Sequence, residues 1–204
     1  MELIIAIFIF AASTSITPGP NNIMIMASGL NFGTRKSVPH YLGICIGFPL
    51  MVALVGAGFG FVFDQYPVLH EIIKIVGIIY LLYLAWVIAN SSPKSLESNK
   101  SNPISFIQAV FFQWVNPKAW IMATGAVAAY TSATSDIYLQ VVIIALIFFA
   151  VSFPCIGMWL VFGVWLKKFL KDPSHQRAFI ISMAFLLVVS IAPITYELIC
   201  EYVT

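Results

Sequence analysis

The sequence is poor in charged residues. Asp, Glu, Lys and Arg make up only 9% of its 204 residues, whereas 61% are hydrophobic. An ordinary soluble domain carries about 25% charged residues. In water, so much apolar surface would aggregate, and the chain is therefore expected to lie in a lipid bilayer. The net charge of +2 is spread over short connections instead of one basic surface, which argues against a nucleic-acid partner.

Long stretches carry no charge at all: residues 3–34, 37–63, 75–93, 119–135, 137–166 and 178–196. Each is about as long as a membrane-spanning helix needs, or longer. The runs are continuously apolar, which favours helices over the alternating strands of a barrel. We therefore predict an all-α membrane protein, one transmembrane domain over residues 1–204, with six transmembrane helices at 3–30, 38–62, 69–90, 104–130, 137–165 and 177–199.

No basic residue precedes Arg35, whereas a secretory signal peptide opens with a basic region. The first run is therefore expected to stay in the mature protein. The basic residues that follow fall mainly in alternate connections: Arg35, Lys36, Lys94, Lys100, Lys167, Lys168, Lys171 and Arg177. Because positively charged loops remain in the cytoplasm, these connections are predicted to lie inside, and both termini outside.

Catalytic and metal-binding patterns are also missing. The chain has no HExxH motif, no pair of acidic residues deep in a span, and no histidine near Cys45 or Cys155 that would suggest an activated thiol. Its three cysteines, with Cys200 the third, lack metal-ligand spacing and are interpreted as packing residues. We expect no cofactor and no enzymatic activity. A channel or a membrane scaffold remains an alternative to a transporter.

A polar stretch divides the chain near its middle. Residues 91–103 are rich in Ser, Asn, Pro and Lys, and they separate a first repeat (1–90) from a second (104–204). Three spans per repeat require the second repeat to enter from the opposite side of the membrane. Phe48-Pro49 followed by Gly58 recurs 105 residues later as Phe153-Pro154 followed by Gly163. The sequence thus predicts two inverted three-helix repeats.

The first and fourth predicted helices are both interrupted. The first contains Thr17, Pro18, Gly19, Pro20, Asn21 and Asn22, and the fourth contains Asn116, Pro117 and Lys118. Proline removes a backbone hydrogen bond, so neither helix can continue unbroken. At about 1.5 Å per residue, both breaks fall near the bilayer middle. Paired breaks at that depth are typical of a transporter's binding site, although kinks satisfied by neighbouring helices are the alternative.

The chemistry of the two breaks suits a zwitterion. Asn116 is predicted to cap a helix that restarts at Pro117, and Pro18 or Pro20 to restart the first, with Thr17 or Asn21 as its cap. Free N–H groups, helix dipoles and the Lys118 ammonium would bind a carboxylate. Unpaired carbonyls at residues 13–16 and 112–115 would bind an ammonium. The predicted substrate-binding residues are Thr17, Pro18, Gly19, Pro20, Asn21, Asn22, Gln113, Asn116, Pro117 and Lys118.

Lys118 is the only ionisable residue predicted near the middle of a span, where a lysine costs about 2.5–3.5 kcal/mol. It is predicted to bind a carboxylate or to couple transport to protons; the alternative is a lysine that reaches water through a cavity with another purpose. His40 is expected to be solvated near the cytoplasmic interface. Gly43 and Gly47 predict close helix packing, either within one protomer or in a homo-oligomer.

These motifs resemble the LysE/RhtB amino-acid exporter superfamily. The resemblance rests on Thr17 to Asn22, Gly33 to Arg35, Tyr80 to Trp86 and Asn116 to Lys118. The stretch from Pro103 to Lys118 is most similar to the cysteine and O-acetylserine exporter branch. The resemblance implies proton-driven efflux of small amino acids from the bacterial cytoplasm across the inner membrane. Many members carry aspartate where this chain has Asn21, so its proton coupling must use Lys118 or another group, or differ.

Overall fold

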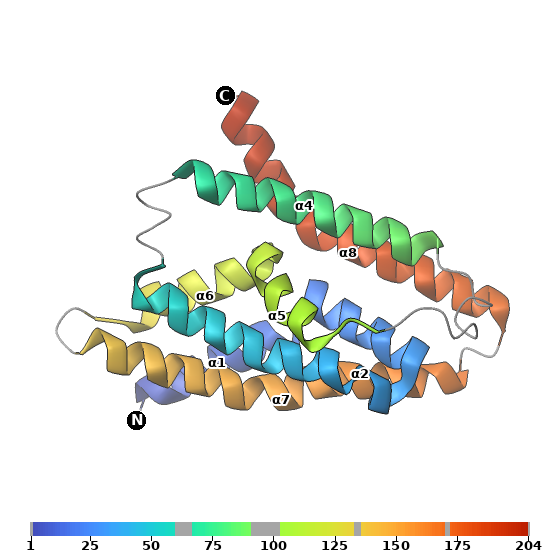
Figure 1. Cartoon of the computed structure of the whole chain (residues 1–204), viewed down its shortest axis with the longest axis horizontal. Coiled ribbons are helices and arrows are strands. Elements are labelled where there is room, and N and C mark those ends of the chain that lie inside the picture. The colour runs from blue at the N-terminus through green and yellow to red at the C-terminus, as the bar shows by residue number, and fades with distance from the viewer. Residues whose placement is uncertain (1, 60–66, 91–102, 133–135, 170–171, 204) are drawn as a thin grey trace.

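The protein is helical throughout the part that its structure describes. The computed structural model describes residues 2–59, 67–90, 103–132, 136–169 and 172–203, and no strand occurs among them (Figure 1). Its elements are α1 (Glu2–Ile16), α2 (Pro20–Leu54), the π-helix η1 (Val55–Phe59), α4 (Pro67–Asn90), α5 (Phe106–Val115), α6 (Pro117–Tyr130), α7 (Ile137–Phe169) and α8 (Pro173–Val203). The predicted all-α class is confirmed.

Both predicted breaks are present. The first predicted helix is divided into α1 and the start of α2, and the fourth into α5 and α6. The boundary predicted between the first two helices falls at Gly33, because α2 consists of two helical limbs that meet at this residue. Gly33 reverses the chain inside α2 with φ 76° and ψ 174°, a backbone region that favours glycine. One residue therefore replaces the loop expected over residues 31–37.

Helices α2 and α7 form the centre of the molecule. The first limb of α2 approaches α7 so closely that a Cβ atom at Gly163 would collide with the Met26 carbonyl. Helix α1 packs against α7, and α5 packs against α2. A Cβ atom at Gly43 would lie 2.6 Å from the Ala109 Cβ, and one at Gly47 would lie 2.8 Å from the Val110 Cα. The two glycines of the GxxxG motif are therefore used inside this chain, against α5.

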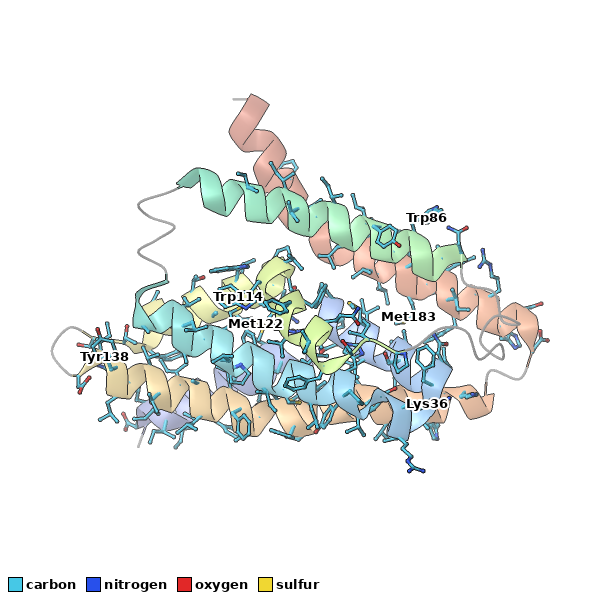
Figure 2. All side chains as sticks on the ribbon, in the orientation of Figure 1. Lys36, Trp86, Trp114, Met122, Tyr138 and Met183 are labelled. Carbon is cyan, nitrogen blue, oxygen red and sulfur yellow. The ribbon has the colours of Figure 1, made fainter. Side chains whose placement is uncertain are left out.

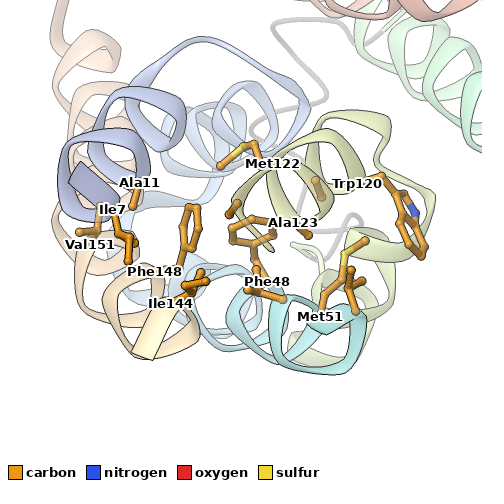
Figure 3. Packing of buried hydrophobic residues seen from close by; sticks show 14 of the residues in the cluster. Ile7, Ala11, Phe48, Met51, Trp120, Met122, Ala123, Ile144, Phe148 and Val151 are labelled. Carbon is orange, nitrogen blue, oxygen red and sulfur yellow. The ribbon is translucent and has the colours of Figure 1, made fainter. Parts of the chain in front are cut away.

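Two clusters of buried hydrophobic side chains join the remaining helices to this centre. Helices α4 and α8 lie side by side along one flank (Figure 1), and a cluster containing Ile23, Leu81, Phe112 and Met183 joins them to α2 and α5. A second cluster gathers α1, α2, α6 and α7 around Phe148 (Figure 3). The Phe48 and Phe148 rings meet edge to face with centroids 5.1 Å apart. This cluster packs directly beside the two breaks.

The outer surface is strongly apolar. Ile9, Phe111, Leu146 and Phe185 each expose 60% or more of their surface. Among the described residues, Pro20–Gly58 and Ile137–Lys167 are long and apolar enough to cross a membrane, and Glu2–Ile16, Phe106–Val115 and Arg177–Val189 are shorter apolar segments. Side chains of this kind over so much of a surface are consistent with a bilayer as the surrounding solvent.

Opposite ends of the molecule differ in charge. Lys36, beside the Gly33 reversal, lies at one end, and Tyr138, beside Asp136 at the start of α7, lies at the other (Figure 2). The C-terminal end of α7, which carries Lys167, lies at the same end as Lys36 (Figure 1). The basic residues that are described in these two connections thus share one end of the molecule.

Candidate functional site

The first break lies between α1 and α2. Gly19 precedes α2 as its N-cap in extended backbone, and Pro20 is the first helical residue, as one of the two predicted alternatives. The prediction that Thr17 or Asn21 caps this helix is wrong. The Thr17 hydroxyl instead donates to the Thr14 carbonyl at 2.8 Å, and the Asn21 amide bonds to Gln113. Within the described chain, the backbone N–H groups of Asn21 and Asn22 accordingly have no hydrogen-bond acceptor.

Side chains satisfy most of the carbonyls that end α1. The Asn22 amide donates to the carbonyls of Ser15 at 2.8 Å and Thr17 at 2.7 Å, and Trp159 Nε1 donates to the Ile16 carbonyl at 3.1 Å. The expectation of free carbonyls is therefore wrong here for Thr14, Ser15 and Ile16. It is also wrong at the end of α5, where the Gln113 and Trp114 carbonyls accept from the Asn116 N–H and from Trp120 Nε1. Both amide hydrogens of Asn22 are used, but its oxygen has no hydrogen-bond donor among the described residues. Asn22 is only 3% exposed.

The second break lies between α5 and α6. Asn116 caps α6 through its side-chain oxygen, which accepts from the Lys118 N–H at 3.1 Å, and Pro117 is the first helical residue. Both features follow the sequence prediction. The Asn116 carbonyl accepts from the Ala119 N–H at 3.0 Å and the Trp120 N–H at 3.3 Å. The first N–H groups of α6 are therefore occupied, and the expectation that this end offers free donors is wrong.

Two contacts join the breaks across about half the chain. Lys118 Nζ donates to the carbonyl and the hydroxyl of Thr17, both at 2.8 Å, and to the Pro18 carbonyl at 3.3 Å. The side-chain amides of Asn21 and Gln113 bond reciprocally, at 2.8 and 3.2 Å. Gln113 is fully buried and also donates to the Ala109 carbonyl. The structure thus brings together residues 17–22 and residues 113–118.

A cavity of about 380 Å³, including the space at its mouth, lies between the breaks. Its polar lining is Thr14, Ser15, Gly19, Asn21, Asn22, Asn116, Lys118 and Ser152, and its apolar lining is Ile44, Phe48, Ala119, Met122 and Ile156. Because this volume includes open space at the mouth, the enclosed part of the cavity is small. Among the described residues of the lining, Lys118 is the only one whose side chain carries a full charge.

Five of the predicted site residues line this cavity: Gly19, Asn21, Asn22, Asn116 and Lys118. The other five surround it. Thr17 and Pro18 accept hydrogen bonds from Lys118, and Gln113 hydrogen-bonds to Asn21. Pro20 and Pro117 are the first residues of α2 and α6.

Sequence analysis did not single out Ser152 or the apolar lining. Ser152 is 3% exposed, and its hydroxyl makes no hydrogen bond to the described residues. The sequence contained a signal for this wall, because Phe48 and Ser152 adjoin the two Phe-Pro pairs of the proposed repeats. Among the described residues, no group of three His, Cys, Asp or Glu side chains could hold a metal ion.

His40 is buried, at 1% exposure, and the expectation that it is solvated is wrong. The reversal at Gly33 folds the second limb of α2 back against the first. His40 Nδ1 consequently lies 2.8 Å from the Ser28 hydroxyl on the first limb. His40 does not line the cavity.

An apolar bundle whose two broken helices meet around a polar cavity has the architecture of a helical membrane transporter. The comparison with known families agrees with this class. The chain belongs to the LysE type translocator family, whose model matches residues 12–193. The resemblance inferred from the motifs is therefore confirmed.

Individual relatives match a smaller part of the chain than the family model does. The chain is similar to the cysteine/O-acetylserine efflux proteins of Salmonella typhimurium strain LT2 and Escherichia coli strain K12. Each is 34% identical over 131 residues, which is 63% of this chain and 65% of the relative. The matched region thus spans slightly less than two thirds of these relatives. No solved structure matches the chain.

Proposed function

We propose that the protein exports small neutral amino acids from the bacterial cytoplasm across the inner membrane, by alternating access and in exchange for protons. The observation that carries this proposal is the contact of Lys118 with Thr17, which joins two broken helices around a small cavity. Family membership and the efflux of cysteine and O-acetylserine after which the relatives are named support export of these two compounds.

The cavity offers a partner for each end of a zwitterion. The N–H groups of Asn21 and Asn22 lie at the positive end of the α2 dipole and, with Lys118, would bind the carboxylate. The free oxygen of Asn22, together with the Thr17 and Pro18 carbonyls that now accept from Lys118, would bind the ammonium. Ile44 and Met122 leave an apolar space for the substrate side chain. No acidic side chain among the described residues lines the cavity, so a cationic substrate side chain would lack a partner among them.

The proposed architecture is six transmembrane helices in two inverted repeats, 1–90 and 104–204, joined by residues 91–103. The packing supports it, because exchanging the repeats turns the contact of α1 with α7 into that of α5 with α2. The same exchange maps the pair of α4 and α8 onto itself. The shared end of Lys36 and the end of α7 supports a cytoplasmic face there, with both termini outside.

Proton coupling is assigned to Lys118. Asn21 stands where many family members carry aspartate, and its amide is tied to Gln113. Lys118 is therefore the cavity's candidate for a group that gains and loses a proton during transport. Its side chain contacts both breaks, so a change in its charge would act on both repeats at once.

The test is efflux of labelled cysteine, O-acetylserine and serine from preloaded vesicles, with protein levels matched. Lys118→Met keeps most of the side-chain volume and removes the charge, so efflux should fall by about tenfold or more. Lys118→Arg should also impair efflux, because a planar guanidinium does not replace a compact ammonium. Lys36→Met is the control, since Lys36 is exposed at the end of the molecule.

Three results would contradict the proposal. Wild-type efflux of every substrate by Lys118→Met would exclude a role for this lysine at the carboxylate. Efflux that only runs downhill, and that a protonophore leaves unchanged, would favour a channel. A protein that moves none of the three substrates would be better interpreted as a scaffold.

A further inference from the structure

All three N–H donors of the Lys118 ammonium have hydrogen-bond acceptors. A lysine ammonium has three N–H donors, and three acceptors surround this one: the Thr17 carbonyl, the Thr17 hydroxyl and the Pro18 carbonyl. All three belong to the segment that directly follows α1, at the negative end of that helix dipole. These are the acceptors that a substrate ammonium would need.

The Thr17 and Pro18 acceptors form a binding site that is called the ammonium seat below. The backbone next to this seat packs directly against the Lys118 side chain. A Cβ atom at Gly19 would lie 2.6 Å from Lys118 Cδ and 3.1 Å from Nζ, so the lysine rests directly on the glycine backbone. Gly19 has an extended backbone with φ −175°, which any residue can adopt. The glycine is therefore required by the packing of Lys118 and not by its own backbone conformation.

Several hydrogen-bond donors of the cavity, unlike these acceptors, are not occupied by the described residues. The N–H groups of Asn21 and Asn22 have no acceptor in the described chain, and no Asp or Glu side chain lines the cavity. Asn116 is only 2% exposed, yet its amide nitrogen, a hydrogen-bond donor, lacks a partner among the described residues. The protein thus fills the ammonium seat with its own lysine and leaves the carboxylate donors unused.

We propose that Lys118 competes with the substrate's ammonium for the acceptors of Thr17 and Pro18. Substrate binding then moves the Lys118 ammonium from these acceptors to the substrate's carboxylate. This inference rests on the proposed function and adds how the site selects its substrates. An amine without a carboxylate displaces the lysine and leaves a buried charge unpaired. An acid without an amine draws the lysine away and leaves the carbonyls unpaired. Only a molecule that carries both groups satisfies both ends.

Two variants distinguish the two proposed roles of Lys118, as a competitor for the ammonium seat and as a ligand of the substrate's carboxylate. Lys118→Met removes the charge and vacates the ammonium seat. Gly19→Ala keeps the charge, but its Cβ atom displaces the flexible end of the lysine from that seat. The matched control is Lys36→Met, which removes an exposed lysine outside the cavity.

The experiment is isothermal titration calorimetry of the full chain in detergent micelles with three probes. Cysteine carries both groups, cysteamine lacks the carboxylate, and 3-mercaptopropionate lacks the ammonium. Wild type and Lys36→Met should bind cysteine most tightly. Lys118→Met and Gly19→Ala should both bind cysteamine about tenfold or more tightly than wild type, because a competing charge-assisted hydrogen bond is gone. Only Lys118→Met should lose 3-mercaptopropionate.

A measurement on the wild-type protein checks the same idea without any variant. Saturating acetate should raise the affinity for cysteamine several-fold over chloride at equal ionic strength, because acetate gives the displaced lysine its partner.

Three results would overturn the inference. Unchanged cysteamine binding in both variants would do so, even if Lys118→Met lost cysteine and thereby supported the carboxylate site. An absent acetate effect in wild type would do so if the variants did not fold. Wild-type protein that binds none of cysteine, O-acetylserine and serine would refute the proposed function, and this inference with it.

Discussion

The close contact between α2 and α7 provides a direct test of the fold, through Gly163→Ala. All three atoms nearest to an added Cβ belong to the Met26 backbone, and the carbonyl oxygen would overlap it. No side chain can rotate away, so the two helices must separate. The first limb of α2, which carries Asn21 and Asn22, would move with that separation.

The expected size follows from two opposing effects. Overpacking costs about 1–3 kcal/mol, and a clash with backbone belongs near the upper end of that range. Replacing glycine by alanine in a helix returns about 1 kcal/mol. The net loss is about 2 kcal/mol, and one kcal/mol corresponds to about 2–4 °C in Tm for a domain of this length. Gly163→Ala should therefore lower Tm by about 4–8 °C.

Gly125→Ala is the matched control, because no atom lies within 4 Å of its added Cβ. It should raise Tm by about 2–4 °C through helix propensity alone. Thermal unfolding in detergent, followed by size exclusion, measures both variants. Gly29→Ala meets the Leu160 carbonyl in the same interface, so combining it with Gly163→Ala should cost less than the sum. If Gly163→Ala behaved like Gly125→Ala, α7 could not approach α2 as described.

Three further predictions concern the site and the topology. Asn21→Asp places a carboxylate against the Gln113 oxygen, so it should destabilise the protein by about 1–3 kcal/mol, with a double-mutant cycle showing coupling to Gln113→Ala. Ser152→Ala should leave Tm nearly unchanged, because the hydroxyl has no partner, but should shift efflux preference between serine, cysteine and O-acetylserine by about two- to tenfold. Thiol labelling should reach Lys36→Cys only from the cytoplasm and Asp136→Cys only from outside, and the reverse pattern would contradict the assigned orientation.

The breaks themselves could be predicted from sequence because their causes are local. Pro20 and Pro117 lack an N–H group and preset the backbone of a first helical turn, so each starts its helix wherever the fold places it. Asn116 caps α6 through its own side chain and the next residues. Features of this kind depend on a few neighbouring residues, and the sequence contains all of them.

The partners of the freed backbone groups could not be predicted, because they depend on tertiary contacts. The Ile16 carbonyl is satisfied by Trp159, which is 143 residues away in the sequence. His40 seemed close to a solvated loop, but the single-residue reversal at Gly33 places it against Ser28. A loop of ordinary length would have left that histidine at the surface. Sequence alone gives neither the length of this reversal nor the packing across it.

The first break also accounts for a deep lysine beside the proposed site for zwitterions. Ending α1 and restarting α2 within three residues sets a negative helix end next to a positive one. A single cation can satisfy only the negative end, and Lys118 lies there, bonded to Thr17 and Pro18. An amino acid carries both charges at a separation of the same order, so it matches both helix ends at once. The lysine charge that is costly in lipid is then paired in either arrangement, with α1 alone or with the substrate carboxylate. The proposed selection for zwitterions and the tolerance of the buried lysine would thus have the same physical origin.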